Sequence, residues 1–237
     1  MILKRDIRDA FRNIPVAPAN QWLLGFEWKD QFYVETCLPF GLGTAPFLFN
    51  LFAEGLHWAI ECRTHNAAVL HYLDDFLFVS PPLQDVTPLD ELWRSLTDYL
   101  GIPRNDSKDR QGQIVEVLGI EIDTLKLEAR LSATKLEKAK EGTAKLLHSG
   151  FSSLSELQEV AGFLAFCARV TRYGPPFLAS LWAWIAILPG GGKRRRIPRS
   201  VIEDLRWWHD LLPSFNGVLL LNVSERPFFL NLYKRLP

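Results

Sequence analysis

The sequence predicts an α+β fold in which a mixed segment of helices and strands precedes a mostly helical one. Up to residue 131, short apolar runs separated by turn residues indicate strands, and two longer runs have helical spacing. After residue 132, helical spacing and helix-start signals predominate. The 237 residues, 48% of them hydrophobic, are enough for one large or two small folded domains. We therefore expect a structural boundary near residue 132.

The elements of the first part follow from these patterns in order. A short apolar and basic lead predicts a strand that ends at Asp6, and an aromatic-rich hairpin over 22–36 is expected to turn at Lys29-Asp30. A glycine-containing loop over 38–43 precedes a long apolar helix. The helix is predicted over 45–62, and the later elements are strands over 68–72 and 76–80, a helix over 90–100, and a hairpin of 115–122 with 125–131.

The second part begins with two helix-start signals. Thr134 with Glu137, and Ser153 with Glu156, have the spacing of capping boxes. The apolar run 177–188 is far shorter than the roughly 20 residues of a membrane span, so we interpret it as a buried helix and expect no membrane partner. The remaining elements are a glycine-rich basic linker, a helix over 199–212, and strands over 217–221 and 228–232.

Charge and cysteine content restrict the class of protein. The 27 basic and 27 acidic residues balance, but residues 31–130 hold seven basic and fifteen acidic side chains, and residues 190–237 hold nine and four. Such a distribution suits a protein that gathers carboxylates around cations and holds a polyanion elsewhere. The three cysteines cannot all pair and form no C-x-x-C motif. With no signal peptide, we expect a cytoplasmic or nuclear location.

Two adjacent carboxylates, Asp74 and Asp75, lie between the strands predicted over 68–72 and 76–80. Neighbouring ionised carboxylates repel each other unless a cation lies between them, and Mg²⁺ prefers oxygen ligands. A solvated turn is the alternative, because aspartate is common in turns. Asp6 ends another predicted strand and can face the same hairpin, which favours a metal site that handles phosphates.

Four segments, in matching order and spacing, resemble consecutive motifs of the reverse transcriptase palm: 6–16, 38–50, 72–75 and 118–120. Phe40 in the Leu-Pro-Phe-Gly loop is more similar to LTR retrotransposons of the gypsy type and to DIRS-type elements than to retroviruses. The resemblance implies that residues 1–131 form a right-hand palm, which is an antiparallel sheet with packed helices. Residues 132–189 would form a helical thumb-like region. A basic linker, a helix and the start of an RNase H-like region follow over 190–237. The family's fingers segment is largely missing, so the chain resembles a region truncated at both ends.

The resemblance implies an RNA-directed DNA polymerase that adds dNTPs to a primer 3′-hydroxyl on an RNA or DNA template. It implies two Mg²⁺ ions as cofactors, with Mn²⁺ as a substitute, and the rest of a retroelement polyprotein as a partner. A catalytically inactive palm-thumb remnant, which at most binds nucleic acid, is the alternative. A different metal-dependent phosphotransferase would explain the acidic residues but not the Leu-Pro-Phe-Gly loop together with Phe11.

The family's site residues can be carried over by position. Asp6 and Asp74 would hold the two ions together with the backbone of Ile7, and Asp75 would support them. Lys108 resembles the lysine that protonates pyrophosphate, with a solvated surface lysine as the alternative. Phe11 resembles the aromatic gate that excludes a ribose 2′-hydroxyl, with a core aromatic as the alternative. The implied nucleotide-binding residues are Ile7, Arg8, Asp9, Ala10, Phe11, Phe40, Gly41 and Leu73.

Contacts to the primer and template are also implied, and a hairpin over 117–123 would grip the primer strand. The implied residues are Tyr72, Leu118, Gly119, Lys138 and Lys145. Lys138 and Lys145 are seven residues apart, on one helical face, and a solvated face is the alternative. The basic run 193–199 is interpreted as a phosphate-binding segment, a nuclear signal or an exposed linker.

Overall fold

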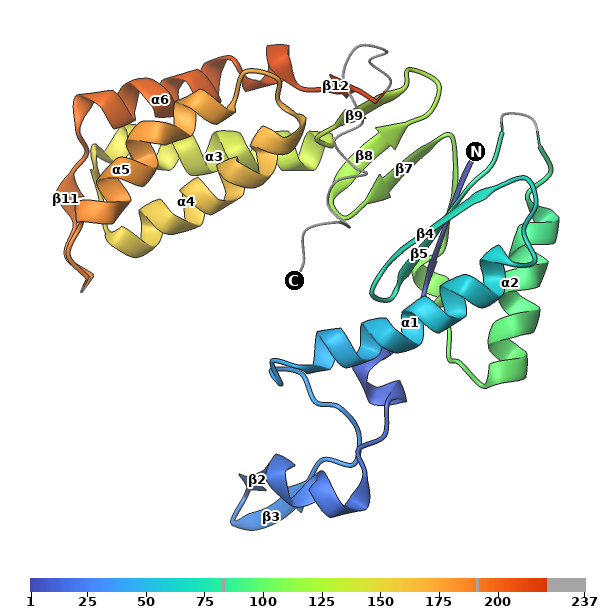
Figure 1. Ribbon diagram of the computed structural model, residues 1–237. Helices are drawn as coiled ribbons and strands as arrows, with labels where there is room; N and C mark the ends of the chain where they lie inside the picture. The colour runs from blue at the N-terminus through green and yellow to red at the C-terminus, as the bar shows by residue number, and fades with distance from the viewer. Residues whose placement is uncertain (82–83, 191, 221–237) are drawn as a thin grey trace. The chain divides into compact units, whose positions relative to one another are not determined.

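The chain divides into two compact units, Met1–Val115 and Glu116–Pro237. The computed structural model describes residues 1–81, 84–190 and 192–220 (Figure 1). The second unit begins before the predicted boundary at residue 132, because the strands over 120–130 share the core of the following helices. Ile120, Ala129 and Leu131 are all buried in that helical core.

The first unit is built on a four-stranded antiparallel sheet with the order β4-β5-β1-β6. Its strands are β1 (Ile2–Asp6), β4 (Ala68–Tyr72), β5 (Asp75–Val79) and β6 (Arg110–Gly112). In the register of β1 and β5, Ile2 lies opposite Val79 and Asp6 lies opposite Asp75. The end of β1 therefore meets the turn of the β4–β5 hairpin, as the sequence predicted.

Two helices, α1 (Ala45–Glu61) and α2 (Thr87–Leu100), contribute to the apolar core of this unit. The buried residues of α1 recur every three or four positions, which is the spacing of one helical face. Trp93 of α2 is fully buried and its ring lies 5.0 Å from that of Phe76 on the sheet. Helix α2 begins three residues earlier than predicted, with Pro88 in its first turn, where proline is well tolerated.

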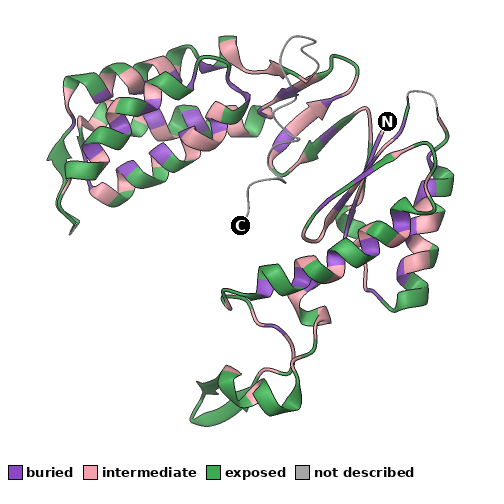
Figure 2. Cartoon of the chain, in the orientation of Figure 1, coloured by how far each residue is buried: buried purple, intermediate pink, exposed green. Residues whose placement is uncertain are grey.

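The predicted aromatic hairpin is present as β2 (Gly25–Trp28) and β3 (Gln31–Val34), and it turns at Lys29 and Asp30. Both turn residues have positive φ, at 51° and 59°, as tight two-residue hairpins require. Every residue of both strands is exposed (Figure 2). Three 3₁₀ segments complete the unit: η1 (Ala10–Asn13), η2 (Pro18–Leu24) and η3 (Asp106–Lys108).

A second four-stranded sheet has the order β12-β9-β8-β7, and its strand β7 crosses the boundary between Val115 and Glu116. Its strands are β7 (Ile114–Val117), β8 (Ile120–Asp123), β9 (Glu128–Arg130) and β12 (Val218–Leu219). The single strand predicted over 115–122 is wrong, because Leu118 and Gly119 have positive φ of 49° and 79° and turn the chain between β7 and β8. The strand predicted over 228–232 lies outside the described residues.

The helices of the second unit are α3 (Ala133–Ser149), α4 (Leu154–Cys167), α5 (Ala179–Ile187) and α6 (Arg199–Asp210). The 3₁₀ segments η4 (Ala168–Val170) and η5 (Pro175–Leu178) lie between α4 and α5, and η6 (Leu212–Phe215) follows α6. The capping box of Ser153 and Glu156 is confirmed. The predicted box at Thr134 is wrong, because the N-cap of α3 is Ser132, two residues earlier, and it forms no side-chain cap hydrogen bond.

The apolar run that was predicted to form a buried helix corresponds to η5 and α5. Leu181 and Trp184 are buried in the core, but Trp182 and Ile187 are exposed, so the helix is covered on one side only. In the described ranges 1–81, 84–190 and 192–220, no helix combines the length and the apolar character needed to cross a membrane.

A buried histidine pair in the first unit makes its stability depend on pH. His57 of α1 and His71 of β4 place their Nδ1 atoms 2.7 Å apart, so one ring donates and the other accepts. Burial, followed by the charge of His57, lowers the pKa of His71 below its usual value of 6.5. Between the lowered pKa and 6.5 the unfolded chain therefore binds more protons than the folded chain.

We expect the free energy of unfolding to be retained above pH 6.5 and to fall as the pH falls below 6.5, down to the lowered pKa of His71. Urea unfolding at pH 7.5 and 5.5 measures this dependence. It should become weaker in His71→Gln and stay unchanged in His148→Gln, which replaces an exposed histidine. An identical pH dependence in the wild type and His71→Gln would contradict the assignment.

Candidate functional site

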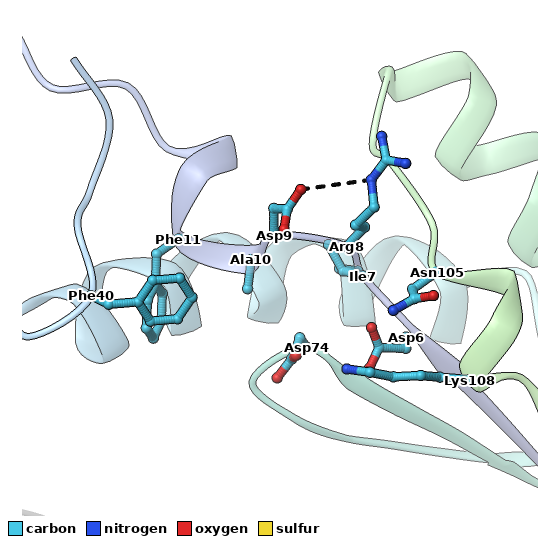
Figure 3. Close-up of a pocket in the computed structure, with 10 residues that line it drawn as sticks. All are labelled: Asp6, Ile7, Arg8, Asp9, Ala10, Phe11, Phe40, Asp74, Asn105 and Lys108. Atoms are coloured by element: carbon cyan, nitrogen blue, oxygen red, sulfur yellow. Dashed lines mark hydrogen bonds and ion pairs between the residues drawn. The ribbon is translucent and has the colours of Figure 1, made fainter. Parts of the chain in front are cut away.

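A pocket of about 320 Å³ opens in the first unit, where β1 ends and the β4–β5 hairpin turns (Figure 3). This volume is in the range of small-molecule sites. Ten residues from the end of β1, the hairpin tip and two loops form its lining. They are Asp6, Ile7, Arg8, Asp9, Ala10, Phe11, Phe40, Asp74, Asn105 and Lys108.

Backbone hydrogen bonds fix the two pocket carboxylates relative to each other. The amide of Ile7 donates to the carbonyl of Asp74 at 3.0 Å, and the amide of Asn105 donates to the carbonyl of Asp6 at 2.9 Å. Leu73 has a positive φ of 52°, so the hairpin turns sharply just before Asp74. Three segments that are distant in sequence are thus joined around Asp6.

Lys108 forms an ion pair with Asp6 inside this pocket. Its Nζ lies 2.9 Å from Oδ1 of Asp6, whose side chain is only 2% exposed. This hydrogen bond, and then the charges of Asp6, Asp74 and Asp75, raise the pKa of Lys108 above its usual value. The lysine therefore remains protonated at neutral pH, with a proton available at Nζ.

The other carboxylate oxygen of Asp6, Oδ2, is buried and has no hydrogen-bond partner within the part of the chain that the structure describes. A buried charged oxygen without a partner is costly. Burial, followed by the nearby charges of Asp6 and Asp75, raises the pKa of Asp74. Both observations indicate missing positive charge beside the two carboxylates.

A divalent ion fits this deficit, since Mg²⁺ takes carboxylate oxygens and fills its remaining positions with water and substrate phosphates. The residues present supply two carboxylates and the backbone of Ile7. The described residues contain no group of three or more acidic, histidine or cysteine side chains placed to hold a metal. Two carboxylates and one carbonyl leave the other coordination positions of such an ion to water or to substrate oxygens.

Asp75 lies opposite Asp6 in the sheet but is not part of the pocket lining. Its Oδ2 lies 3.0 Å from Nζ of Lys4, and both side chains are 16% exposed. The charge of Asp75 is therefore balanced within the protein. This distinguishes it from Asp74, although the two carboxylates are adjacent in sequence.

Aromatic rings form one wall of the pocket. The ring centroids of Phe11 and Phe40 are 5.3 Å apart, and the ring of Phe11 also lies 5.9 Å from that of Phe49 in the core. Phe11 thus contacts the core on one side and lines the pocket on the other, and its role as a gate stays a prediction. Gly41 follows with a φ of 91°, a conformation that favours glycine, although an added Cβ would meet nothing within 4 Å.

Arg8 and Asp9 line the mouth of the pocket with exposed side chains. The backbone amide of Arg8 donates to the carbonyl of Pro103 at 2.9 Å. In the side chain of Arg8, Nε lies 3.7 Å from Oδ2 of Asp9 (Figure 3). Asp9 has a left-handed backbone, with φ at 54°, before the short η1 segment that carries Ala10 and Phe11. This turn places the consecutive residues Asp9, Ala10 and Phe11 in the lining of the pocket.

Sequence reasoning missed the buried ion network beneath the loop that carries Asn105 and Lys108. Arg5 is 4% exposed, and its Nε lies 2.7 Å from Asp90 and 3.4 Å from Asp109. Arg94 contacts the same two carboxylates. The signal was present in Arg5, a basic residue of the predicted apolar and basic strand, but its partners are distant in sequence.

Several predicted site residues lie outside the pocket lining. Tyr72, Leu73 and Gly41 are in the first unit beside it, and Tyr72 is exposed. The others belong to the second unit, where Leu118 and Gly119 form the β7–β8 turn. Nζ of Lys138 lies 4.8 Å from the ring centroid of Phe163, and Nζ of Lys145 lies 3.9 Å from Glu156.

Comparison with known proteins gives a consistent result. A family model described as reverse transcriptase (RNA-dependent DNA polymerase) matches residues 1–122. Protein P of duck hepatitis B virus (strain Germany/DHBV-3) is 31% identical over 120 residues, which are 50% of this chain and 15% of that protein. The Gag-Pol polyprotein of baboon endogenous virus (strain M7) is 39% identical over 85 residues, 32% of this chain and 5% of the polyprotein. The chain thus spans only a small part of these relatives.

Solved structures agree on the fold. The foamy viral protease-reverse transcriptase in complex with an RNA/DNA hybrid matches with a TM-score of 0.70 and 20% identity, over 91% of this chain and 27% of that chain. The same protein in complex with dsDNA matches with a TM-score of 0.66 and 20% identity, over 92% and 42%. These matches confirm the predicted α+β polymerase fold.

Proposed function

Because the chain belongs to the reverse transcriptase family, we propose that it acts as an RNA-directed DNA polymerase, which extends a primer by nucleotidyl transfer from dNTPs. The observation that carries this proposal is the pair of pocket carboxylates, Asp6 and Asp74, which lack a balancing cation at Oδ2 of Asp6. That deficit is what a metal-assisted phosphate reaction requires. The similar structures with bound RNA/DNA hybrid and dsDNA support a template-primer duplex as the partner.

Asp6 and Asp74, with the carbonyl of Ile7, would hold two divalent ions, and Asp75 would steady the hairpin through its pair with Lys4. Two bound Mg²⁺ or Mn²⁺ ions would activate the primer 3′-hydroxyl and neutralise the triphosphate. The chain's own contribution is to hold the carboxylates in a partly dry pocket, so that little reorganisation is needed when substrate binds. Tyr72 and Leu73 are proposed to contact the primer end and the sugar.

Lys108 is proposed to supply the proton that the leaving pyrophosphate takes up. Its raised pKa keeps Nζ protonated, and its side chain is 56% exposed, so it can swing from Asp6 towards a phosphate. When Asp6 engages a cation, its hold on Lys108 weakens. The ion pair in the substrate-free pocket would thus release a proton donor as the site fills.

The walls of the pocket are proposed to select the nucleotide. The backbone from Ile7 to Ala10 would lie along the triphosphate, and Phe11 with Phe40 would contact the sugar. In the second unit, the Leu118-Gly119 turn, Lys138 and Lys145 are proposed to contact the primer-template backbone, where such contacts position the duplex without reading its sequence.

A retrotransposon origin, with the chain as part of a longer polyprotein in the cytoplasm or nucleus, is a narrower proposal. The similarity of Phe40 and its loop to gypsy-type and DIRS-type elements supports it. The alternative of a catalytically inactive remnant keeps the fold and loses turnover. The exposed residues of β2 and β3 favour that alternative, because a bare two-stranded hairpin is only marginally stable in water.

Primer extension on an RNA template separates these two functions. We expect Mg²⁺-dependent addition of dNTPs to a labelled DNA primer, and none when the ion is removed with a chelator. Equilibrium binding of the same template-primer without dNTPs provides the control. Binding without extension, over a range of Mg²⁺ and Mn²⁺ concentrations, would establish the inactive remnant.

A further inference from the structure

The basic run 193–199, here called the basic strand, is an ordered edge of the second unit. It contains no acidic residue. Its five basic residues are Lys193, Arg194, Arg195, Arg196 and Arg199. Its residues Arg195–Arg196 form β11, which pairs antiparallel with β10 (Phe151–Ser152), and the amide of Ile197 donates to the carbonyl of Gly150 at 2.9 Å. The buried side chain of Ile197 anchors the strand.

Arg194 fixes the basic strand from one side. It donates to the carbonyl of Phe151 at 2.9 Å and to Glu156 at 3.1 Å. Arg199 is paired with Glu203 at 2.9 Å. Lys193, Arg195 and Arg196 are exposed and form no ion pair with any residue in the described part of the chain. These three cations are therefore held in place without a counter-charge from the protein.

One helix N-terminus adds to this positive field. Helices α4 and α6 both begin beside the ladder at one end of the helical unit (Figure 1). The N-terminus of a helix carries a partial positive charge of roughly half a unit. The carboxylate of Glu156 already caps α4, whereas α6 has no side-chain cap. Backbone order, free guanidinium groups and the N-terminus of α6 thus converge on one exposed edge.

We infer that the basic strand is a docking surface for the phosphate backbone of a nucleic-acid duplex, an interaction that rests on the proposed polymerase function. Guanidinium groups bind phosphate oxygens through paired, parallel hydrogen bonds. Contacts of this kind hold a duplex without sequence preference.

The test measures binding of a labelled RNA/DNA hybrid to the full chain as a function of salt, in chelator and without dNTPs. Each lost phosphate contact reduces the salt slope by about 0.9. In Arg195→Gln/Arg196→Gln we expect the slope to fall by about 1.8 and the affinity at 0.1 M salt to fall at least about tenfold. Arg195→Lys/Arg196→Lys should restore the slope, because it restores the charge.

The matched control is Arg169→Gln/Arg206→Gln, which removes two other exposed arginines from the same unit. A smaller loss in this control supports a localised surface, and an equal loss would overturn it in favour of general charge attraction. An unchanged slope in Arg195→Gln/Arg196→Gln would overturn the inference. So would a variant that binds the hybrid like the wild type but binds vesicles containing phosphatidylserine more weakly than the wild type does. Because binding is measured without turnover, a chain that fails in primer extension can still pass this test.

Discussion

Asp74→Asn is expected to reduce Mg²⁺-dependent primer extension by about 10³-fold or more, which corresponds to about 4 kcal/mol of transition-state stabilisation. The substitution keeps the shape of the side chain and removes its charge. Asp74 lies at the tip of the β4–β5 hairpin, where its backbone carbonyl accepts a hydrogen bond from the amide of Ile7. The geometry should therefore survive, and the loss would report the missing charge.

The adjacent carboxylate provides a matched control. Asp75 is balanced by Lys4 at 3.0 Å and does not line the pocket, so Asp75→Asn should cost much less activity, on the order of tenfold. Equal extension by the wild type and Asp74→Asn would contradict the proposed metal role. Equal losses in both variants would show that Asp74 and Asp75 contribute equally to extension, and that the ion pair of Asp75 with Lys4 does not distinguish their roles.

Stability gives a second readout of Asp74 that does not depend on turnover. Without a metal, burial and the charges of Asp6 and Asp75 disfavour the ionised form of Asp74. Removing that charge should leave the melting temperature unchanged or raise it. Added Mg²⁺ should stabilise the wild type by binding the folded state alone, and Asp74→Asn should lose most of this gain. Stabilisation by Mg²⁺ of equal size in both proteins would place the ion elsewhere.

The sequence predicted the part of the site that depends on local pattern. Alternating apolar runs predicted β1, β4 and β5, and the position of Asp74 between two strands placed it at a hairpin tip. Since Asp6 ends β1 and Asp74 lies in the turn just before β5, which pairs with β1, their meeting followed from the pattern. The aromatic hairpin and the Ser153 capping box are local in the same sense, and the structure contains both.

Contacts between distant residues were beyond such reasoning. Lys108 reaches Asp6 across 102 positions, and Arg5 reaches Asp90 across 85. No local pattern encodes these pairs. The ladder of β10 and β11 was also missed, because two-residue strands are too short for a periodic signal. The local pattern over 115–122 did not indicate the turn at Leu118 and Gly119, which only the family resemblance placed within a hairpin over 117–123. Positive φ at Leu118 is unusual for a bulky side chain.

Phe11→Ala is expected to weaken discrimination against ribonucleotides by about tenfold to a hundredfold, the range that a steric change in an apolar pocket supplies. The ring of Phe11 lines the pocket and lies 5.3 Å from that of Phe40, so its removal opens space beside the proposed sugar position. The measurement is the ratio of kcat/KM for a dNTP to that for the matching ribonucleotide. Incorporation of dNTPs should change less than incorporation of ribonucleotides.

Phe11 also packs against Phe49 in the core, with 5.9 Å between ring centroids, so Phe11→Ala will lose some stability. Phe11→Leu retains most of that packing and should relax discrimination to a lesser degree, whereas Phe11→Tyr should preserve it. Phe40→Ala removes the neighbouring, exposed ring and tests whether any opening of this wall has the same effect. If Phe11→Ala and Phe11→Leu left sugar discrimination unchanged, Phe11 would be a core aromatic alone. If Phe11 is a gate, the ratio should follow the volume of side chain 11 and respond little to Phe40. Only the ring of Phe11, which is partly buried and packs against Phe49, has a fixed position from which to exclude a 2′-hydroxyl.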